Sequence, residues 1–312
     1  MISSMLNSGP KLIMPFIGIL LFLGIWSGVA KSIDTSLGQF PGPTQVFEQA
    51  LTLIDEHNQQ REKADDFYSR QEERNAARVA KDPTYVPKIR PYTGAPTFFD
   101  QIWTSLYTVM VGFFIASIIA VPVGILCGLS RSAYAAMNPL IQIFKPVSPL
   151  AWLPLVTMVV SAVYISEDPM FSKSFITSAF TVSLCCLWPT LINTAVGVSN
   201  IDSDLVNVSK VLRLKPLSHV QKIVLPASIP MIFTGLRLSL GIGWMVLIAA
   251  EMLAQNPGLG KFVWDEFQNG SSESLSRIMV AVITIGIIGF LLDRLMLTIQ
   301  RYVSWDKNAV LR

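Results

Sequence analysis

The sequence predicts an all-α, polytopic membrane protein with six transmembrane helices and a polar helical insert after the first of them. Of its 312 residues, 51% are hydrophobic and only 14% are charged, and the mean hydropathy is +0.49. These values exclude an ordinary soluble domain. Four stretches without charged residues, at 12–30, 101–130, 146–166 and 174–201, each supply the roughly 20 apolar residues needed to cross a bilayer core.

Two further apolar stretches contain charges and still count as spans. Residues 223–250 contain Arg237, and residues 278–300 contain Asp293 and Arg294 near their far end. Long charged side chains can extend from a helix toward water at the membrane surface, so these charges do not exclude a span. The total of six spans follows.

The distribution of basic residues orients the chain with both termini in the cytoplasm. Outside the polar insert, twelve basic residues, Lys145 among them, fall on the inner side, and only Lys173, Lys261 and Arg277 fall outside. The net charge of +3 follows from this asymmetry and gives no reason to expect nucleic-acid binding. The first span is longer than the core of an export signal, so we expect it to be retained. The expected divisions are an N-terminal transmembrane helix at 1–30, a periplasmic insert at 31–100, a five-helix core at 101–305 and a cytoplasmic tail at 306–312.

The insert at 31–100 differs in composition from the rest of the chain. It holds nine of the 24 basic and eleven of the 21 acidic residues. Residues 45–80 contain no Gly or Pro and much Glu, Gln, Arg and Ala, which favours a helix ended by the prolines that follow. Apolar Phe47, Leu51 and Ile54 are placed to lie along one side of it. The insert is either a docking surface for a soluble partner or a tolerated insertion without a function.

A short polar segment, residues 202–226, lies between the fourth and fifth spans and faces the cytoplasm in this topology. Its helix, expected over 202–216, begins at an N-cap acid, Asp202, and is expected to end at Pro216. It is too short and too charged to span a bilayer. The pattern therefore predicts an amphipathic helix that docks on another protein. Its apolar residues at helical spacing are Leu205, Val208 and Leu212.

The sequence contains no pattern for catalysis or for a cofactor. The two histidines, His57 and His219, have no cysteine or carboxylate array near them at metal-ligand spacing. The run Gly258-Leu259-Gly260-Lys261 lacks the other glycine and the hydroxyl residue of a phosphate loop. The three cysteines lie in apolar spans and are expected to be packing residues. The sequence thus indicates no enzyme and no cofactor, ATP and metals included.

Ionisable residues within the spans are functional candidates, because a charge at membrane depth is costly unless it is paired or hydrated. Glu251, toward the outer end of the fifth span, either shapes an outer gate or is capped by donors from a loop. Arg237, in the same span, extends to the surface, pairs with Asp293 or lies beside the path of an anion. The scarcity of buried carboxylates argues against a proton-coupled carrier that works alone.

Two groups of motifs carry a family resemblance. In the cytoplasmic segment, the run Ile223-Val224-Leu225-Pro226 is preceded by Asn207-Val208-Ser209 and by Arg213. These stand where the permease subunits of binding-protein-dependent ABC importers carry Ile-x-Leu-Pro, Glu-Ala-Ala and Gly. Residues 207–214 resemble the variant loop of the nitrate-type permeases. Residues 98–305 are similar in architecture to the nitrate, sulfonate and taurine branch of this family. The motifs that carry this similarity are Phe233-Thr234-Gly235-Leu236-Arg237, Gly243-Trp244, Ala249-Ala250-Glu251-Met252-Leu253, Gly258-Leu259-Gly260 and Phe262-Val263-Trp264-Asp265.

The resemblance implies a type I ABC importer permease fold, in which the helix at 202–216 couples the permease to an ATPase. The residues it assigns to ATPase docking are Leu205, Asn207, Val208, Ser209, Lys210, Leu212, Arg213 and Leu214. Candidates for the pathway or a gate are Arg237, Trp244 and Glu251.

The implied partners are cytoplasmic ABC ATPase subunits that bind the ATP, a periplasmic solute-binding protein and a second copy of the permease, within the lipid bilayer. The implied location is the bacterial inner membrane. The substrate favoured by the resemblance is nitrate or nitrite. Taurine or an alkanesulfonate, and bicarbonate or cyanate, remain open, as does a stand-alone channel or proton-coupled carrier from another class.

Overall fold

The computed structural model describes residues 9–35, 38–82, 84–165, 170–271 and 273–303, so the tail expected at 306–312 lies outside it. The chain forms two compact units. Unit 1 comprises Met1–Asp100 and Phe262–Ile283, and unit 2 comprises Gln101–Lys261 and Thr284–Arg312. Three helices contribute residues to both units, namely α4 (Phe98–Leu129), α11 (Leu259–Asn269) and α12 (Ser274–Val303).

Unit 1 begins with an apolar helix and a small hairpin and continues into one long helix. The elements are α2 (Gly9–Ala30), β1 (Asp34–Thr35), β2 (Gly38–Gln39) and α3 (Pro43–Lys81). The two strands pair antiparallel. Helix α3 starts where the Gly42 N–H donates to the Gln45 side-chain oxygen at 2.9 Å, with Pro43 in the first turn. It confirms the helix predicted over residues 45–80.

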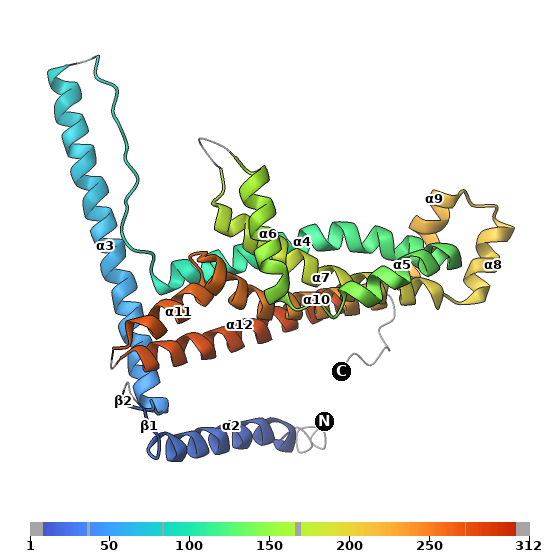
Figure 1. Ribbon diagram of the computed structural model, residues 1–312, viewed down its shortest axis with the longest axis horizontal. Helices are drawn as coiled ribbons and strands as arrows, with labels where there is room; N and C mark the ends of the chain where they lie inside the picture. Colours follow the sequence, from blue (N-terminus) through green and yellow to red (C-terminus); the bar gives the residue numbers. More distant parts are fainter. Residues whose placement is uncertain (1–8, 36–37, 83, 166–169, 272, 304–312) are drawn as a thin grey trace. The chain divides into compact units, whose positions relative to one another are not determined.

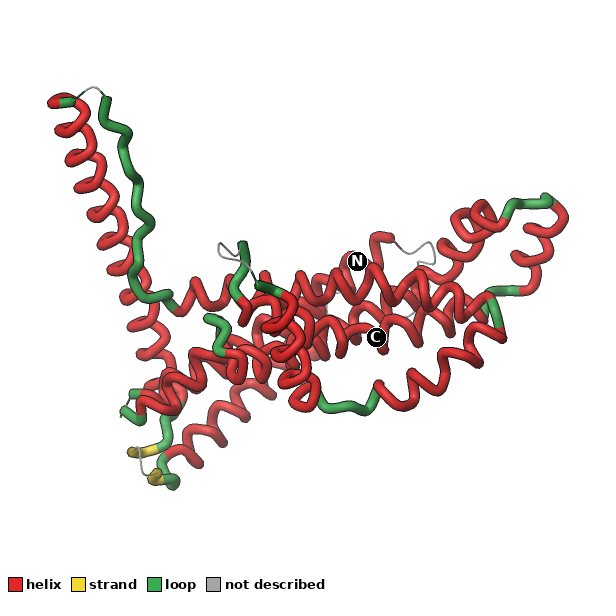
Figure 2. The backbone as a smooth tube through the Cα atoms, turned by 45° about the horizontal axis from the view of Figure 1, so that its top comes forward, coloured by secondary structure: helices red, strands yellow, loops and turns green. Residues whose placement is uncertain are grey.

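An extended segment after α3 runs back along it, as Figures 1 and 2 show. Side chains of α3 hold the backbone of this segment. Gln71 accepts the Arg90 N–H at 2.9 Å and donates to the Arg90 carbonyl at 3.3 Å, and the Tyr68 hydroxyl accepts the Tyr92 N–H at 3.0 Å. Prolines recur through this segment and lack an N–H, so polar side chains of the helix supply much of the pairing. Unit 1 therefore contains a hairpin formed by one helix and one extended segment without regular secondary structure.

The apolar residues that were expected along one side of α3 are not its buried residues. Phe47, Leu51 and Ile54 are all exposed. The buried residues are Val46, Gln49, Leu53 and Gln71. Arg277 of α12 also joins α3 to the rest of unit 1. It forms ion pairs with Glu56 of α3 and, at 3.0 Å, with Glu266 of α11. Polar contacts thus hold much of this helix, which apolar spacing alone does not reveal.

Unit 2 holds most of the apolar helices. Among the described residues of the whole chain, five helices are long and apolar enough to cross a membrane, and a bent helix pair would make a sixth. The remaining helical segments are α5 (Arg131–Phe144), α6 (Pro149–Val163), α7 (Lys173–Ser199), α8 (Ser203–Val211), α9 (Pro216–His219), the π-helix η1 (Val220–Val224) and α10 (Leu225–Ala254).

The bent pair replaces the straight third span expected over 146–166. Helix α5 returns from the end of unit 2 that carries α8 and α9, and stops near the middle of the unit, where the chain turns by 100° into α6 (Figure 1). Helix α6 has 15 residues, fewer than a full span requires. Pro146 and Pro149 frame the turn and cannot donate the backbone hydrogen bonds that would continue α5.

Helices α4 and α7 approach closely along a stripe of small residues. Five positions at intervals of four carry Gly or Ala in α4, and at Gly124 an added Cβ would lie 2.6 Å from the Thr194 Cβ of α7. Small residues at this spacing let membrane helices pack backbone to backbone. The stripe consists of Gly112, Ala116, Ala120, Gly124 and Gly128.

Helices α7 and α10 are joined by buried hydroxyl and thiol groups. The Ser239 hydroxyl lies 2.7 Å from that of Thr190 and 2.5 Å from the Cys186 carbonyl oxygen, and the Cys186 thiol donates to the Ser239 carbonyl at 3.1 Å. Cys186 is buried and belongs to this packing, as expected for a cysteine in an apolar span.

Candidate functional site

Helix α8 is the short amphipathic helix of the polar segment at 202–226. Asp202 is its N-cap, as predicted, and its carboxylate accepts the Asp204 N–H at 2.9 Å. The helix ends at Val211, so its predicted extent to Pro216 is wrong. Pro216 instead occupies the first turn of α9. A backbone N–H at this position would have no acceptor within the helix, so proline breaks no hydrogen bond there.

Arg213 causes the early end of α8. Its φ is +47°, in the left-handed region that glycine adopts without cost. Its N–H donates to the Lys210 carbonyl at 3.1 Å, and the Leu214 N–H donates to the Ser209 carbonyl at 3.2 Å. These bonds close the C-terminus of the helix. Arg213 stands at the glycine position of the family motif, so the backbone keeps the conformation of a glycine turn although the side chain has changed.

Replacing Arg213 with glycine is expected to stabilise this turn by up to about 1 kcal/mol, because a non-glycine residue in the left-handed region carries a penalty of that order. Hydrogen exchange of the Leu214 amide measures the effect, since local opening of the turn exposes that amide. R213A is the matched control: it removes the same charge but keeps the Cβ, so it should gain little. Equal protection in both variants would mean that the charge, and not the backbone, limits the turn.

The outward face of α8 is apolar. Leu205, Val208 and Leu212 are exposed, and Val211, which the amphipathic pattern did not single out, is 81% exposed. A shallow hollow on this face is lined by Asp204, Asn207, Val208, Val211 and Leu212. Of the other predicted docking residues, Lys210 and Arg213 are exposed, Leu214 is half-buried and Ser209 is buried. Ser209 therefore faces inward.

Ser209 connects α8 to the helix that follows it. Its hydroxyl lies 2.7 Å from the Nδ1 atom of His219 in α9. Helix α9 runs without interruption into η1 and α10, where the Leu225 N–H bonds to the Val220 carbonyl in the π pattern. The Ile223-Val224-Leu225-Pro226 motif lies at this junction. The exposed face of α8 is thus tied to a transmembrane helix through a short helical path.

The pathway candidates in α10 are all engaged with neighbouring helices. Arg237 forms a two-point ion pair with Asp293 of α12, through its Nε and, at 3.0 Å, through Nη2. This confirms the pairing that was one of the three expected roles. The indole N–H of Trp244 donates to the Ile285 carbonyl at 2.9 Å, and the residue is 5% exposed. Both contacts hold α10 to the part of α12 in unit 2.

Glu251 is fully buried, and its carboxylate joins three segments of unit 2. The Ser105 hydroxyl of α4 lies 2.9 and 2.8 Å from its two oxygens, and the Gly260 N–H at the start of α11 donates to Oε2 at 3.0 Å. The Ser105 oxygen in turn accepts the Leu259 N–H at 2.9 Å. A carboxylate at a helix N-terminus is favoured by the exposed N–H groups and the helix dipole.

This contact also explains the adjacent Gly-Leu-Gly motif. A Cβ at Gly258 would overlap the Glu251 carboxylate, and one at Gly260 would lie 2.9 Å from the Glu251 Cβ. Only glycine lets the loop approach the carboxylate this closely. The capping of Glu251 by loop donors, one of its two expected roles, is therefore present in the structure.

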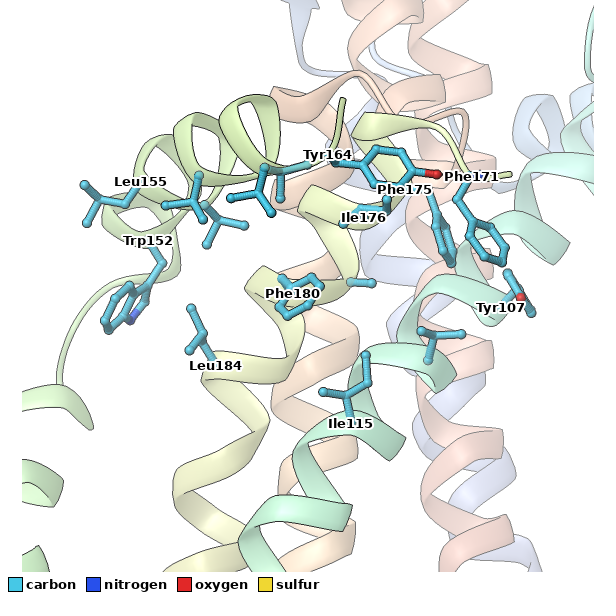
Figure 3. Close-up of a pocket in the computed structure, with 16 residues that line it drawn as sticks. Tyr107, Ile115, Trp152, Leu155, Tyr164, Phe171, Phe175, Ile176, Phe180 and Leu184 are labelled. Carbon is cyan, nitrogen blue, oxygen red and sulfur yellow. Dashed lines mark hydrogen bonds between the residues drawn. The ribbon is translucent and has the colours of Figure 1, made fainter. Parts of the chain in front are cut away.

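A large apolar hollow lies between α4, α6 and α7 (Figure 3). Its volume is about 630 Å³. Aromatic and aliphatic side chains line it, among them Tyr107, Phe175 and Phe180, which come from α4 and α7. The Tyr164 hydroxyl is already used as an acceptor for the Phe171 N–H at 3.2 Å. Such a surface suits acyl chains or another apolar helix and offers little to an inorganic anion.

Comparisons with known proteins show the family to which this chain is similar. Residues 120–304 match the family model described as "Binding-protein-dependent transport system inner membrane component". The chain is 39% identical over 220 residues to the nitrate import permease NrtB of Leptolyngbya laminosa, a match that covers 70% of this chain and 74% of that protein. It is 32% identical to NrtB of Synechocystis sp. over 304 residues, covering 94% and 90% of the two chains.

A bicarbonate transport permease and solved transporters are similar as well. The chain is 35% identical to CmpB of Synechococcus elongatus over 293 residues, which cover 94% of this chain and 89% of that protein. In structure it resembles an inward-facing form of the MetNI methionine ABC transporter, with a TM-score of 0.58 and 15% identity over 66% of this chain and 95% of that one. This likeness shows the type I ABC importer permease fold.

These matches establish the role of the chain at the level of its family. It is a multi-pass inner membrane protein and a transport subunit, not an enzyme, and the hydrolysis of ATP occurs in separate ATPase subunits. A binding protein is the other partner of such a permease. The chain belongs to the family of binding-protein-dependent inner membrane transport components, the permease subunits of ABC importers.

Proposed function

We propose that this permease imports a small inorganic oxyanion, and that the anion is nitrate. The similarity to the two nitrate import permeases carries the proposal, since one match extends over 94% of this chain. Nitrite is expected to share the pathway because it has the same charge and a similar size. Selectivity would rest largely on the binding protein that delivers the anion.

Bicarbonate is the second candidate. The 35% identity to a bicarbonate transport permease extends over the same 94% of the chain, so it is close to the nitrate match in both extent and identity. Nitrate and bicarbonate are both planar, singly charged oxyanions. A pathway built for one therefore needs few changes to conduct the other.

The coupling to ATP is proposed to run through α8. Its exposed apolar residues would enter a groove on an ATPase subunit, with Asn207, Lys210 and Arg213 at the polar edge. Movement of that subunit would then displace α8, and the Ser209–His219 contact and the helical path through α9 and η1 would pass the displacement to α10. A rigid helical connection supports this role because a mobile loop could not transmit force.

The surrounding assembly is proposed from the same resemblance. Two copies of the chain would enclose the pathway, the segment at 31–100 would lie on the periplasmic side, and the α8 end would face the cytoplasm. Arg237, Trp244 and Glu251 would set the position of α10 beside the pathway through the contacts described above. In this arrangement they support the pathway wall and do not bind the anion themselves.

Uptake into vesicles tests the proposal. The permease is reconstituted with its ATPase and binding-protein partners, and ¹⁵N-nitrate uptake is measured with and without ATP on the ATPase side. We expect accumulation only when ATP and binding protein are both present. Uptake of ¹⁴C-bicarbonate without nitrate uptake would replace nitrate by the second candidate. Uptake of taurine instead of either anion would contradict the inorganic substrate, and conduction without ATP would contradict coupled import.

A further inference from the structure

The break between α5 and α6 lies beside the middles of α7 and α10. The side chains beside it include Trp188 and Pro189 of α7 and Ile242 of α10. These residues are near the middle of a 27-residue helix and of a 30-residue helix, both of which are long and apolar enough to cross a membrane. Broken helices at the middle of a membrane leave backbone groups and helix ends available to ions.

Lys145 places a positive charge at this break. Counting of basic residues assigns it to the cytoplasmic side, but the structure places it next to the middles of α7 and α10, at the C-terminus of α5. Its side chain is exposed and makes no salt bridge to any residue in the described parts of the chain. Arg237, by contrast, is neutralised by Asp293. A lysine without a counter-ion beside the middles of two membrane-spanning helices is costly and indicates a functional site.

A cavity of about 190 Å³ adjoins Lys145. A water molecule occupies about 30 Å³ of liquid, so the space admits a small hydrated anion. No carboxylate lines it. The residues that matter for its chemistry are Phe144, Lys145, Trp152, Cys185 and Trp188.

Trp188 adds a hydrogen-bond donor that has no acceptor. Its indole N–H is buried and unpaired within the described structure, although a buried indole N–H normally finds a partner. Its ring stacks on Phe144 at a centroid distance of 6.1 Å and an angle of 12°. The N-terminus of α6, capped by Ser148, begins beside the same cavity and contributes the positive end of a helix dipole. The lysine charge, the indole N–H and the N-terminus of α6 each favour a negative ligand.

We propose that this cavity is a transient binding site for a small, singly charged oxyanion on its way through the permease, with the Lys145 ammonium as its counter-ion and the Trp188 N–H as a donor. The inference rests on the proposed import of such an anion and names the site at which the chain meets it. The apolar hollow shown in Figure 3 shares Trp152 with this cavity and has no comparable charge.

The test measures the number of anions taken up per ATP hydrolysed in vesicles that contain the complete transporter. The wild type is first assayed with ¹⁵N-nitrate and ¹⁴C-bicarbonate, and the anion that it transports is used for the variants. The wild-type assay thus tests the proposed substrate, and the variants then test the proposed site separately. The variants are K145Q, K145R and W188F, and K173Q removes a lysine charge from the exposed first residue of α7 as a matched control.

Losing the charge at Lys145 is expected to lower the ratio roughly tenfold in K145Q, because the anion loses a charge-assisted partner while the ATPase cycle continues. K145R should stay near wild type, W188F should fall by roughly threefold, and K173Q should not change. A wild-type ratio in both K145Q and W188F, or an equal fall in K173Q, would overturn the proposal. If K145Q fails to assemble, an unchanged ratio in W188F overturns it.

Discussion

Replacing Glu251 with alanine is expected to lower the free energy of unfolding by roughly 2–4 kcal/mol, because it removes the acceptor for two buried donors and leaves a cavity. The Ser105 hydroxyl is fully buried, and the Gly260 N–H lies at the start of α11, so water does not readily replace the carboxylate at either. The measurement is the thermal unfolding of the purified permease in detergent, together with the yield of folded protein from membranes.

Two further variants separate this contact from a general effect of charge. E251Q keeps one oxygen acceptor and should lose less stability than E251A. E72A removes an exposed carboxylate from α3 and should unfold at the wild-type temperature. An E251A protein as stable as the wild type would show that Glu251 does not hold α4, α10 and the start of α11 together.

A Val208→Glu substitution is expected to abolish association with the ATPase and to reduce uptake more than tenfold, because burying an uncompensated carboxylate in an apolar docking groove costs several kcal/mol. Val208 lies on the exposed face of α8 with 47% of its surface accessible, so the change should not disturb the fold of the permease itself. Copurification of the ATPase subunits and ATP-dependent uptake measure the two effects.

Val86→Glu is the matched control for this substitution. Val86 lies on the extended segment after α3 and is 77% exposed, and it receives the same change of side chain. It should leave ATPase association at the wild-type level. Normal copurification and uptake in the Val208 variant would contradict the assignment of α8 as the coupling helix.

Most of the fold could be predicted from the sequence because apolar length decides which segments cross a membrane. The exception is the third apolar window. Its composition suits a straight span, but Pro146 and Pro149 break the helix, and hydropathy does not register a bend. The helices α5 and α11 were likewise not predicted, since each is short and interrupted by polar residues. The bend in the third window could have been predicted from its two closely spaced prolines, Pro146 and Pro149.

The candidate site could be predicted only where its contacts are local in sequence. The cap at Asp202 follows from residue type alone, and the pairing of Arg237 with Asp293 follows from the need to neutralise charges at membrane depth. The partner of Glu251 could not be foreseen, because Ser105 lies 146 residues away. For the left-handed turn at Arg213 the available signal was the glycine position of the family motif, since arginine itself seldom adopts that conformation.

The π-helix η1 sets the rotation of α8 and α9 about the axis of α10. Each residue of an α-helix advances the chain by about 100° of rotation, so the extra residue in the π turn at Val220–Val224 turns everything before it by that amount relative to α10. Deleting one residue there would leave a continuous helix and an intact bundle. The apolar face of α8 would nevertheless point about a quarter turn away, so the length of this short segment is under a tighter constraint than its composition.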